Sequence, residues 1–298
     1  QGAVEPQAVA PWLAALGLAT DEDGVQETLL AAILDLTAMT RGYLLGYDGG
    51  RLARIATRRL DFATELAEGF STTIADEALI TGEPVYVIDA AGAERFRAAA
   101  SVVALGLRSV VALPVATATT ILGVAYADRT AIDPLLGPAD LAQLQMLATY
   151  AAERTLGLRA AAEAQEARRW ALGVASAAGE LAATPPAERP AKLAAALARL
   201  AGADAAAWYA GETVVACFNR APALPDGLTE RATPAGVYGS LADDAGTPRW
   251  LACLAVPGRP EVFGLGGPGA DAGASERHLP AALGALAPWL QNFAAGGY

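Results

Sequence analysis

The stretch RSVVALPVATATTILGVAYADR, residues 108–129, decides which fold the chain can adopt. Its 19 inner residues, 109–127, carry no charge, and roughly 18 consecutive apolar residues are enough for a membrane-spanning helix. The residue types favour strands instead, because β-branched side chains are frequent and because Pro114 and a Thr-rich run interrupt the stretch. We therefore predict two antiparallel strands, 109–115 and 121–127, whose continuous apolarity indicates a sheet that is covered on both faces.

The composition is that of a globular protein with more than one domain. The chain has 298 residues, whereas a single domain typically has about 100–200. Its net charge of −11 disfavours a surface that binds nucleic acid or anionic lipid. Two cysteines are too few for a disulfide framework, and no signal peptide opens the sequence. We therefore expect a cytoplasmic protein without nucleic-acid or membrane partners. Since the first residue is Gln rather than Met, the sequence is also compatible with a fragment that lacks an attached effector domain.

An internal repeat divides the chain into two copies. Residues 108–115 resemble 249–256, and the Leu-Gly at 122–123 recurs as Phe-Gly at 263–264, in both cases at an offset of 141 residues. Two further pairs of segments correspond in the same order, 42–58 with 204–220 and 138–153 with 275–292. Each copy is therefore predicted to contain two helices, a hairpin, a middle section, a second hairpin and a final helix. This order predicts an α+β fold in which a central antiparallel sheet carries helices on one face.

Three runs of the first copy, in this order, resemble the GAF domain family. They are TDEDGVQETLLAAILDLTAMTRGYLLGYD at 20–48, STTIADEALITGEPVYVIDAAGAERF at 71–96 and LRSVVALPVATATTILGVAYADR at 107–129. The resemblance covers about residues 8–156, while the second copy, about 166–293, is degenerate as a GAF domain. It implies a module that senses small molecules, often in tandem and often dimeric, upstream of an output such as a kinase, a cyclase or a transcription activator.

The middle section differs most between the copies. It spans 50 residues from Arg58 to Arg108 but only 29 from Arg220 to Arg249, so the second copy is shorter by 21 residues. In GAF domains this section roofs a pocket over the sheet, and a ligand pocket needs a roof that excludes water. We therefore expect the ligand pocket in the first copy alone.

Six residues of the first copy are candidate ligand contacts: Arg54, Asp89, Arg95, Phe96, Ser109 and Tyr126. Arg54 is a charge within a predicted strand, and it either reaches the ligand or keeps its head in water at the rim. Asp89, Arg95 and Phe96 match the Asp followed by Arg-Phe that is usual in the family, with a loop ion pair beside a packed ring as the alternative. The hydroxyls of Ser109 and Tyr126 lie on apolar strands, where each binds either the ligand or a backbone group.

The sequence lacks the residues that several cofactors, metal sites and catalytic mechanisms require. The first copy contains no Cys and no His, so haem, a thiol-linked bilin and a Cys/His metal site have no ligands there, and we expect neither metal nor cofactor. No P-loop, dinucleotide-binding, metalloprotease or serine-nucleophile motif occurs, so we expect no enzyme. In the second copy, Cys217 and Cys253 are interpreted as buried hydrophobes with a redox pair as the alternative, and His278 as a surface residue.

A segment of 46 residues, 138–183, connects the copies and contains no proline after its first position. As a helix with a rise of about 1.5 Å per residue it would be about 70 Å long. Its middle alternates alanine with charged residues, and no small domain needs such a length. We therefore expect this helix to pair with a second chain in a parallel homodimer, with a solvated rod as the alternative.

Together these features predict a cytoplasmic, non-enzymatic tandem GAF sensor. The first domain is expected to bind an unidentified small molecule, and the connecting helix is expected to dimerise. Two alternatives remain: a ligand-free dimerisation and scaffolding module, and the input region of a larger signalling enzyme or transcription regulator. Saturable binding of a ligand to the first domain would separate the sensor from the scaffold.

Overall fold

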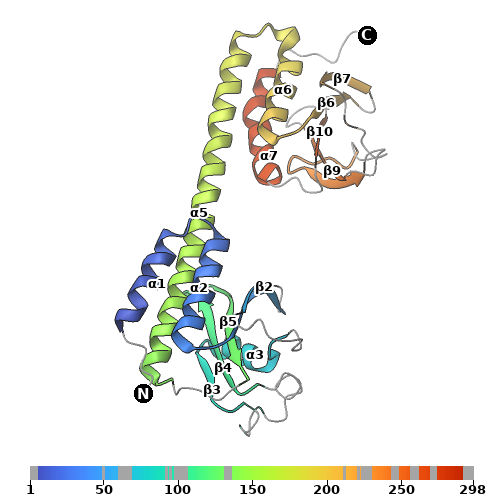
Figure 1. The fold of residues 1–298 in the computed structure, drawn as a ribbon. Helices are drawn as coiled ribbons and strands as arrows, with labels where there is room; N and C mark the ends of the chain where they lie inside the picture. The colour runs from blue at the N-terminus through green and yellow to red at the C-terminus, as the bar shows by residue number, and fades with distance from the viewer. Residues whose placement is uncertain are drawn as a thin grey trace. The chain divides into compact units, whose positions relative to one another are not determined.

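The computed structural model shows two compact units, Gln1–Ala161 and Ala162–Tyr298, whose boundary falls within one helix, α5 (Pro138–Ala183). The structure describes residues 6–48, 51–59, 69–90, 93, 96, 107–130, 136–210, 213–219, 222, 230–242, 248–255, 262–268 and 274–290. Each unit contains one antiparallel sheet of five strands together with helices, which confirms the predicted α+β class (Figure 1). Of the helices described, none is long and apolar enough to cross a membrane.

The first unit places the two strands predicted from residues 108–129 near the middle of its sheet. Its elements are α1 (Pro6–Leu18), α2 (Glu22–Thr37), β1 (Arg41–Asp48), β2 (Arg51–Arg59), α3 (Thr72–Thr81), β3 (Val85–Val87), β4 (Ser109–Ala116), β5 (Ile121–Arg129) and the start of α5. The strand order is β2-β1-β5-β4-β3. Strands β4 and β5 pair as an antiparallel hairpin, as predicted, and each has a strand on both sides.

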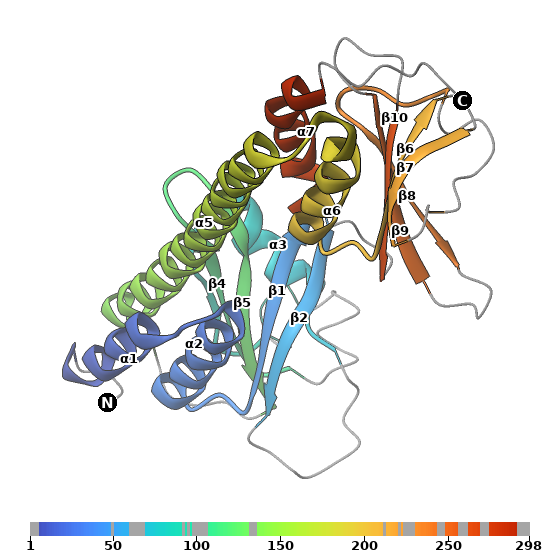
Figure 2. The same cartoon turned by 90° about the horizontal axis from the view of Figure 1, so that it is seen from above.

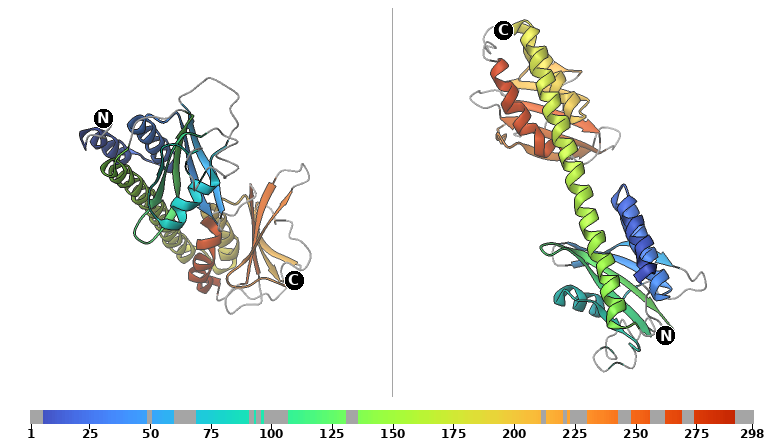
Figure 3. Two further views of the ribbon diagram at one scale, coloured as in Figure 1. Left: turned by 90° about the horizontal axis from the view of Figure 1, so that it is seen from below. Right: turned by 90° about the vertical axis from the view of Figure 1, so that its left-hand side faces the viewer.

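The two faces of this sheet have different covers. One face, here called the helix face, packs against α1, α2 and α5 through a core that includes Leu44, Leu113, Ile33 and Leu147. The opposite face, here called the lid face, packs against α3 (Figure 3). Because successive strand residues point to opposite faces, the continuous apolar run in β4 supplies both cores. Each fully buried aliphatic side chain of this kind contributes about 1.5–3 kcal/mol to folding.

The second unit repeats this topology. Its elements are η1 (Pro186–Glu188), α6 (Arg189–Ala201), β6 (Ala205–Ala210), β7 (Thr213–Phe218), β8 (Val237–Ala242), β9 (Pro248–Ala255), β10 (Val262–Pro268), α7 (Ala274–Leu286) and η2 (Ala287–Leu290). The strand order β7-β6-β10-β9-β8 corresponds strand for strand to that of the first unit. Helices α6 and α7 and the end of α5 cover one face of the sheet (Figure 2), around Trp208 and Phe263. The internal repeat is therefore a repeat of the fold.

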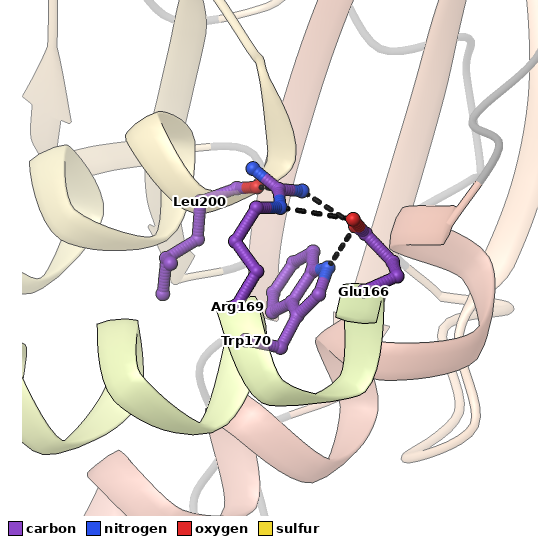
Figure 4. A network of polar contacts seen from close by, with 4 residues as sticks. All are labelled: Glu166, Arg169, Trp170 and Leu200. Carbon is purple, nitrogen blue, oxygen red and sulfur yellow. Dashed lines mark hydrogen bonds and ion pairs between the residues drawn. The ribbon is translucent and has the colours of Figure 1, made fainter. Parts of the chain in front are cut away.

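A polar network joins α5 to the other helices of the second unit. The Glu166 carboxylate accepts hydrogen bonds from Nε and Nη2 of Arg169, at 3.0 and 2.6 Å, and from Nε1 of Trp170 at 2.9 Å (Figure 4). Arg169 also donates to the carbonyl of Leu200 in α6 at 3.1 Å. The hydrogen bond from Arg169 lowers the pKa of Glu166. His278, interpreted as a surface residue, is partly exposed, and its ring stacks on that of Trp170 with 5.8 Å between centroids.

The two cysteines lie too far apart to form a redox pair. Along one row of the sheet, Cys217 pairs with Ala207, Ala207 with Gly264 and Gly264 with Cys253. Three strand spacings of about 4.8 Å separate the cysteines, whereas the Cα atoms of a disulfide lie roughly 4.4–6.8 Å apart. Burial was predicted for both; Cys253 is buried but Cys217, on the edge strand β7, is exposed.

This arrangement predicts selective alkylation. Burial raises the pKa of the Cys253 thiol to about 11, so very little of it is thiolate at pH 8 and the group is also inaccessible. Iodoacetamide should therefore add one adduct to the native chain, at Cys217, and a second only after unfolding in guanidinium, as read by mass spectrometry. The variant Cys217→Ser should take up no adduct while native. Two adducts on the native chain would contradict the placement of Cys253.

Candidate functional site

Three aromatic rings fill the centre of the lid face. Tyr43 of β1 and Tyr126 of β5 are paired in register, and Phe70 lies just before α3. The ring centroids are 6.0–6.1 Å apart in all three pairs, with tilted planes. Tilted aromatic pairs at such distances stabilise a core beyond their buried area. The lid face is therefore anchored by side chains from three separate segments.

A buried ion pair lies beside these rings. Arg41 of β1 and Asp128 of β5 form the next pair along the same face of the sheet. Nε of Arg41 donates a hydrogen bond to Oδ1 of Asp128 at 2.6 Å. Their side chains are 1% and 0% exposed. Burial alone would lower the pKa of Arg41, but the carboxylate of Asp128 outweighs this and raises it, so the guanidinium is charged.

The two terminal nitrogens of Arg41 distinguish this pair from a structural salt bridge. Both Nη1 and Nη2 are buried, and neither has a hydrogen-bond acceptor among the described residues. A buried donor without an acceptor costs about 1–3 kcal/mol, and buried polar groups in folded proteins are almost always satisfied. Arg41 therefore offers two unused donors on the lid face.

Tyr126 adds a hydroxyl to the same cluster. Its oxygen accepts a hydrogen bond from the backbone N–H of Ser71 at 3.3 Å, just before α3. Burial, and after it the negative charge of Asp128, raises the pKa of Tyr126 well above its ordinary value. The phenol is therefore protonated at physiological pH, and its O–H donates to the carboxylate of Asp128.

The structure brings some of the predicted contacts together and separates others. Phe96 and Tyr126 both lie in the lid-face core. Ser109 is buried but lies on the helix face, because strand alternation places it with Val111 and Leu113. Ser109 therefore does not share a face of the sheet with Tyr126.

The charged candidates are not part of the lid-face core. Arg54 is exposed on β2, where it is paired with Leu45 of the lid-face core. Asp89 forms a half-exposed ion pair with Arg108 at 2.8 Å. Arg95 is outside the described residues. The loop ion pair considered as the alternative for Asp89 is therefore present, with Arg108 as the partner.

Sequence reasoning missed the pair Arg41 and Asp128. The available signal was a charge at the end of each of two apolar strands, RGYLLGYD and ILGVAYADR. When two antiparallel strands pair so that their charged ends lie opposite each other, opposite charges stabilise the pairing and like charges destabilise it. That β1 and β5 are neighbours could be learned only from the sheet order.

The helix face carries a groove of 380 Å³ at one end of the sheet. Its lining comes from α2, β1, β2, β4, β5 and α5, and includes Leu44, Gly46, Ile55, Val115 and Gly123. Arg159 of α5 and Glu22 of α2 form a bidentate ion pair at 2.8 and 2.6 Å among the lining residues. No cluster of three His, Cys, Asp or Glu residues suited to a metal ion occurs in the described part of the chain.

Comparison with known proteins identifies the first unit. Residues 19–153 match the family model of the GAF domain. The fold is similar to the crystal structure of bacteriophytochrome RpBphP3 from the photosynthetic bacterium R. palustris, with a TM-score of 0.61 at 14% identity over 88% of this chain and 62% of that one. It is also similar to the Stigmatella aurantiaca phytochrome photosensory core module, with a TM-score of 0.50 at 14% identity over 70% of this chain and 48% of that one.

The two phytochrome structures resemble this chain in fold but hardly in sequence. At 14% identity the two phytochrome structures share the fold alone with this chain. The chain spans less than two thirds of the length of either. A comparison with curated protein sequences gave no match. The first unit therefore carries a GAF domain over residues 19–153, and the second unit repeats its strand order without a family match of its own.

Proposed function

We propose that the chain is a cytoplasmic, non-enzymatic sensory module whose first domain binds a small molecule on the lid face. The observation that carries this proposal is the pair of buried, unsatisfied terminal nitrogens on Arg41. A ligand that supplies an acceptor to them recovers the cost of leaving them unpaired. Because Arg41 and Asp128 together are neutral, an uncharged acceptor such as a carbonyl or amide oxygen fits better than an anion beside Asp128.

The rings around Arg41 fit the same ligand class. Tyr43 and Tyr126 are fully buried in the lid-face core, and a ligand that reaches Arg41 would lie against their rings. A flat, uncharged molecule with a carbonyl oxygen, such as a nucleobase, would stack on the rings and accept from Arg41. The GAF family match and the fold shared with a photosensory module agree with a role in sensing.

A thermal-shift screen of the whole chain against nucleobases, nucleosides and amino acids tests this function. A ligand present at about 100 times its Kd stabilises the native state by about 2.7 kcal/mol. The shift should be lost in Arg41→Lys, which keeps the charge but removes the forked donors, and retained in Arg54→Lys, which changes an exposed arginine. Tyr126→Phe serves as a second variant that retains the ring. The absence of any shift, with an intact dimer, would favour the ligand-free scaffold.

We further propose that α5 mediates a parallel homodimer. A stripe of exposed residues recurs at intervals of three or four along α5: Gly157, Ala161, Ala164, Arg168, Ala171 and Ala175. All of these except Arg168 are Gly or Ala, and small side chains at this spacing allow two helices to approach closely. Such a dimer would let a ligand bound in the first domain influence whatever output the full-length protein carries.

Light scattering with two matched variants tests the dimer. Ala164→Glu should dissociate it, because the carboxylates of the two chains would face each other across the seam. Ala162→Glu is the control, since two residues along a helix of 3.6 residues per turn place it on roughly the opposite side, and it is likewise exposed. The dimer should therefore survive in Ala162→Glu. A monomer in the unmodified chain at all concentrations would contradict the proposal.

A further inference from the structure

The groove on the helix face owes its shape to two paired glycines. Gly46 of β1 and Gly123 of β5 are directly opposite each other, so this rung between the two strands carries no side chains. The next pair on this face is Leu44 and Ala125, whose side chains belong to the helix-face core. The bare rung leaves the hollow of 380 Å³ between the sheet and the helices α2 and α5. Ligand pockets typically measure about 300–1,000 Å³.

The rim of this groove exposes more apolar surface than the rest of the sheet. Tyr47, Ile55 and Ile121 line it and are 43%, 54% and 44% exposed. A single exposed hydrophobic residue is ordinary, but several around one hollow mark a binding site. Ile55 is the extra residue of a β-bulge opposite Leu44 and Leu45, and it reaches over Gly46. Bulges commonly redirect a side chain toward a functional site.

The polar end of the groove is formed by α2 and α5. Arg159 uses Nε and Nη2 to hold the Glu22 carboxylate, and both side chains are partly exposed. Glu22 is the first residue of α2, where the helix dipole favours a negative charge even without Arg159. Glu22 can therefore release Arg159 to another carboxylate at little cost, since exposed ion pairs contribute only about 0–1 kcal/mol.

From this geometry we infer a second ligand site, separate from the lid face, which binds a small carboxylic acid with an apolar ring or chain. The apolar part occupies the hollow above Gly46 and Gly123. The carboxylate replaces that of Glu22 on the forked donors of Arg159, a bidentate geometry that arginine favours. Arg159 lies two residues before Ala161, where the first unit ends. Binding thus exchanges a contact between α2 and α5 for a contact between the ligand and α5.

Three indole probes of similar size separate the parts of this inference. Indole-3-acetate carries a carboxylate, tryptamine an ammonium group and 3-methylindole no charged head. We expect indole-3-acetate to bind the whole chain at least about tenfold more tightly than tryptamine, with 3-methylindole between them, as measured by calorimetry. No saturable binding of indole-3-acetate up to about 5 mM, or tighter binding of tryptamine, would overturn the proposal.

Variants locate the binding within the groove. Arg159→Gln should weaken the binding of indole-3-acetate about tenfold, whereas Arg58→Gln, which removes an exposed charge on β2 outside the groove, should leave it unchanged. Glu22→Gln should tighten binding by about threefold or more, because it removes the competing carboxylate. Gly46→Ala should weaken binding, since the new methyl would lie 3.1 Å from Ile55 and fill the floor. If both Arg159→Gln and Gly46→Ala bound indole-3-acetate as tightly as the unmodified chain, the proposed site would be contradicted.

The lid-face proposal is tested independently of this one. Arg41 is not among the residues that line the groove. Arg41→Lys should therefore leave the affinity for indole-3-acetate unchanged, while it abolishes the shift produced by a lid-face ligand. Loss of both responses in Arg41→Lys would mean that the two sites are one and would contradict the inference.

Discussion

Replacing Arg41 by Met is expected to destabilise the first domain by about 3–5 kcal/mol. The change removes the guanidinium but leaves the carboxylate of Asp128 buried, where the side chain is 0% exposed. An isolated buried carboxylate must either remain charged in an apolar surrounding or take up a proton, and both cost free energy. Guanidinium denaturation followed by circular dichroism measures the loss, with hydrogen exchange used to assign it to the first unit.

The matched double variant separates the ion pair from the packing. In Arg41→Met/Asp128→Leu both charges are replaced by apolar side chains, and most of the lost stability should return, since a buried ion pair can often be replaced without cost. A loss below about 1 kcal/mol in Arg41→Met alone would contradict the buried environment of the pair. If Arg41 instead exists to bind a ligand, the double variant should be stable and unresponsive to that ligand.

Much of the fold followed from local and repeated patterns. The charge-free run between Arg108 and Asp128 contained its own turn and β-branched residues, so the hairpin β4–β5 could be predicted without knowledge of distant segments. The offset of 141 residues then transferred this hairpin to β9 and β10. Helix α5 was predicted with its observed bounds, because proline at its start and after its end leaves the segment free of breakers.

The site was harder to predict because its residues meet through non-local pairing. Arg41 and Asp128 are 87 residues apart, and only the placement of β5 beside β1 brings them together. Ser109 could not be assigned to a face from the sequence, because a strand that is apolar on both sides gives no alternation from which to infer its faces. Cys217 was expected to be buried, but the sequence of β7 does not reveal that it is an edge strand.

The groove could not be predicted for a related reason. Glycine in a strand indicates a close approach or a bulge, but Gly46 and Gly123 form a hollow only because they are paired with each other. The same pairing makes a strong prediction about Gly123. A Cβ built at this position would overlap the carbonyl oxygen of Leu45 in the neighbouring strand, and Gly123 has a φ of 158°.

Gly123→Ala is therefore expected to cost about 3 kcal/mol or more, because backbone cannot move aside as a flexible side chain can. Two other glycines are controls. Gly82 has a φ of 69° with no atom near its Cβ position, so Gly82→Ala should cost about 1 kcal/mol from backbone strain alone. Gly157 lies in α5 with open space around it, so Gly157→Ala should stabilise the chain by about 0.5–1 kcal/mol.

The ranking of the three variants distinguishes a close approach of two strands from the ordinary effects of glycine. Denaturation of each variant under identical conditions provides the three free energies of unfolding. If Gly123→Ala costs no more than Gly82→Ala, then β1 and β5 do not approach closely at Leu45, and the bare rung that forms the floor of the groove would not exist as described. A larger cost at Gly123 together with a small one at Gly46→Ala would show that the backbone of β1 at Leu45 leaves no room for a side chain at Gly123, and that Gly46 is free to be filled when the groove is tested for binding.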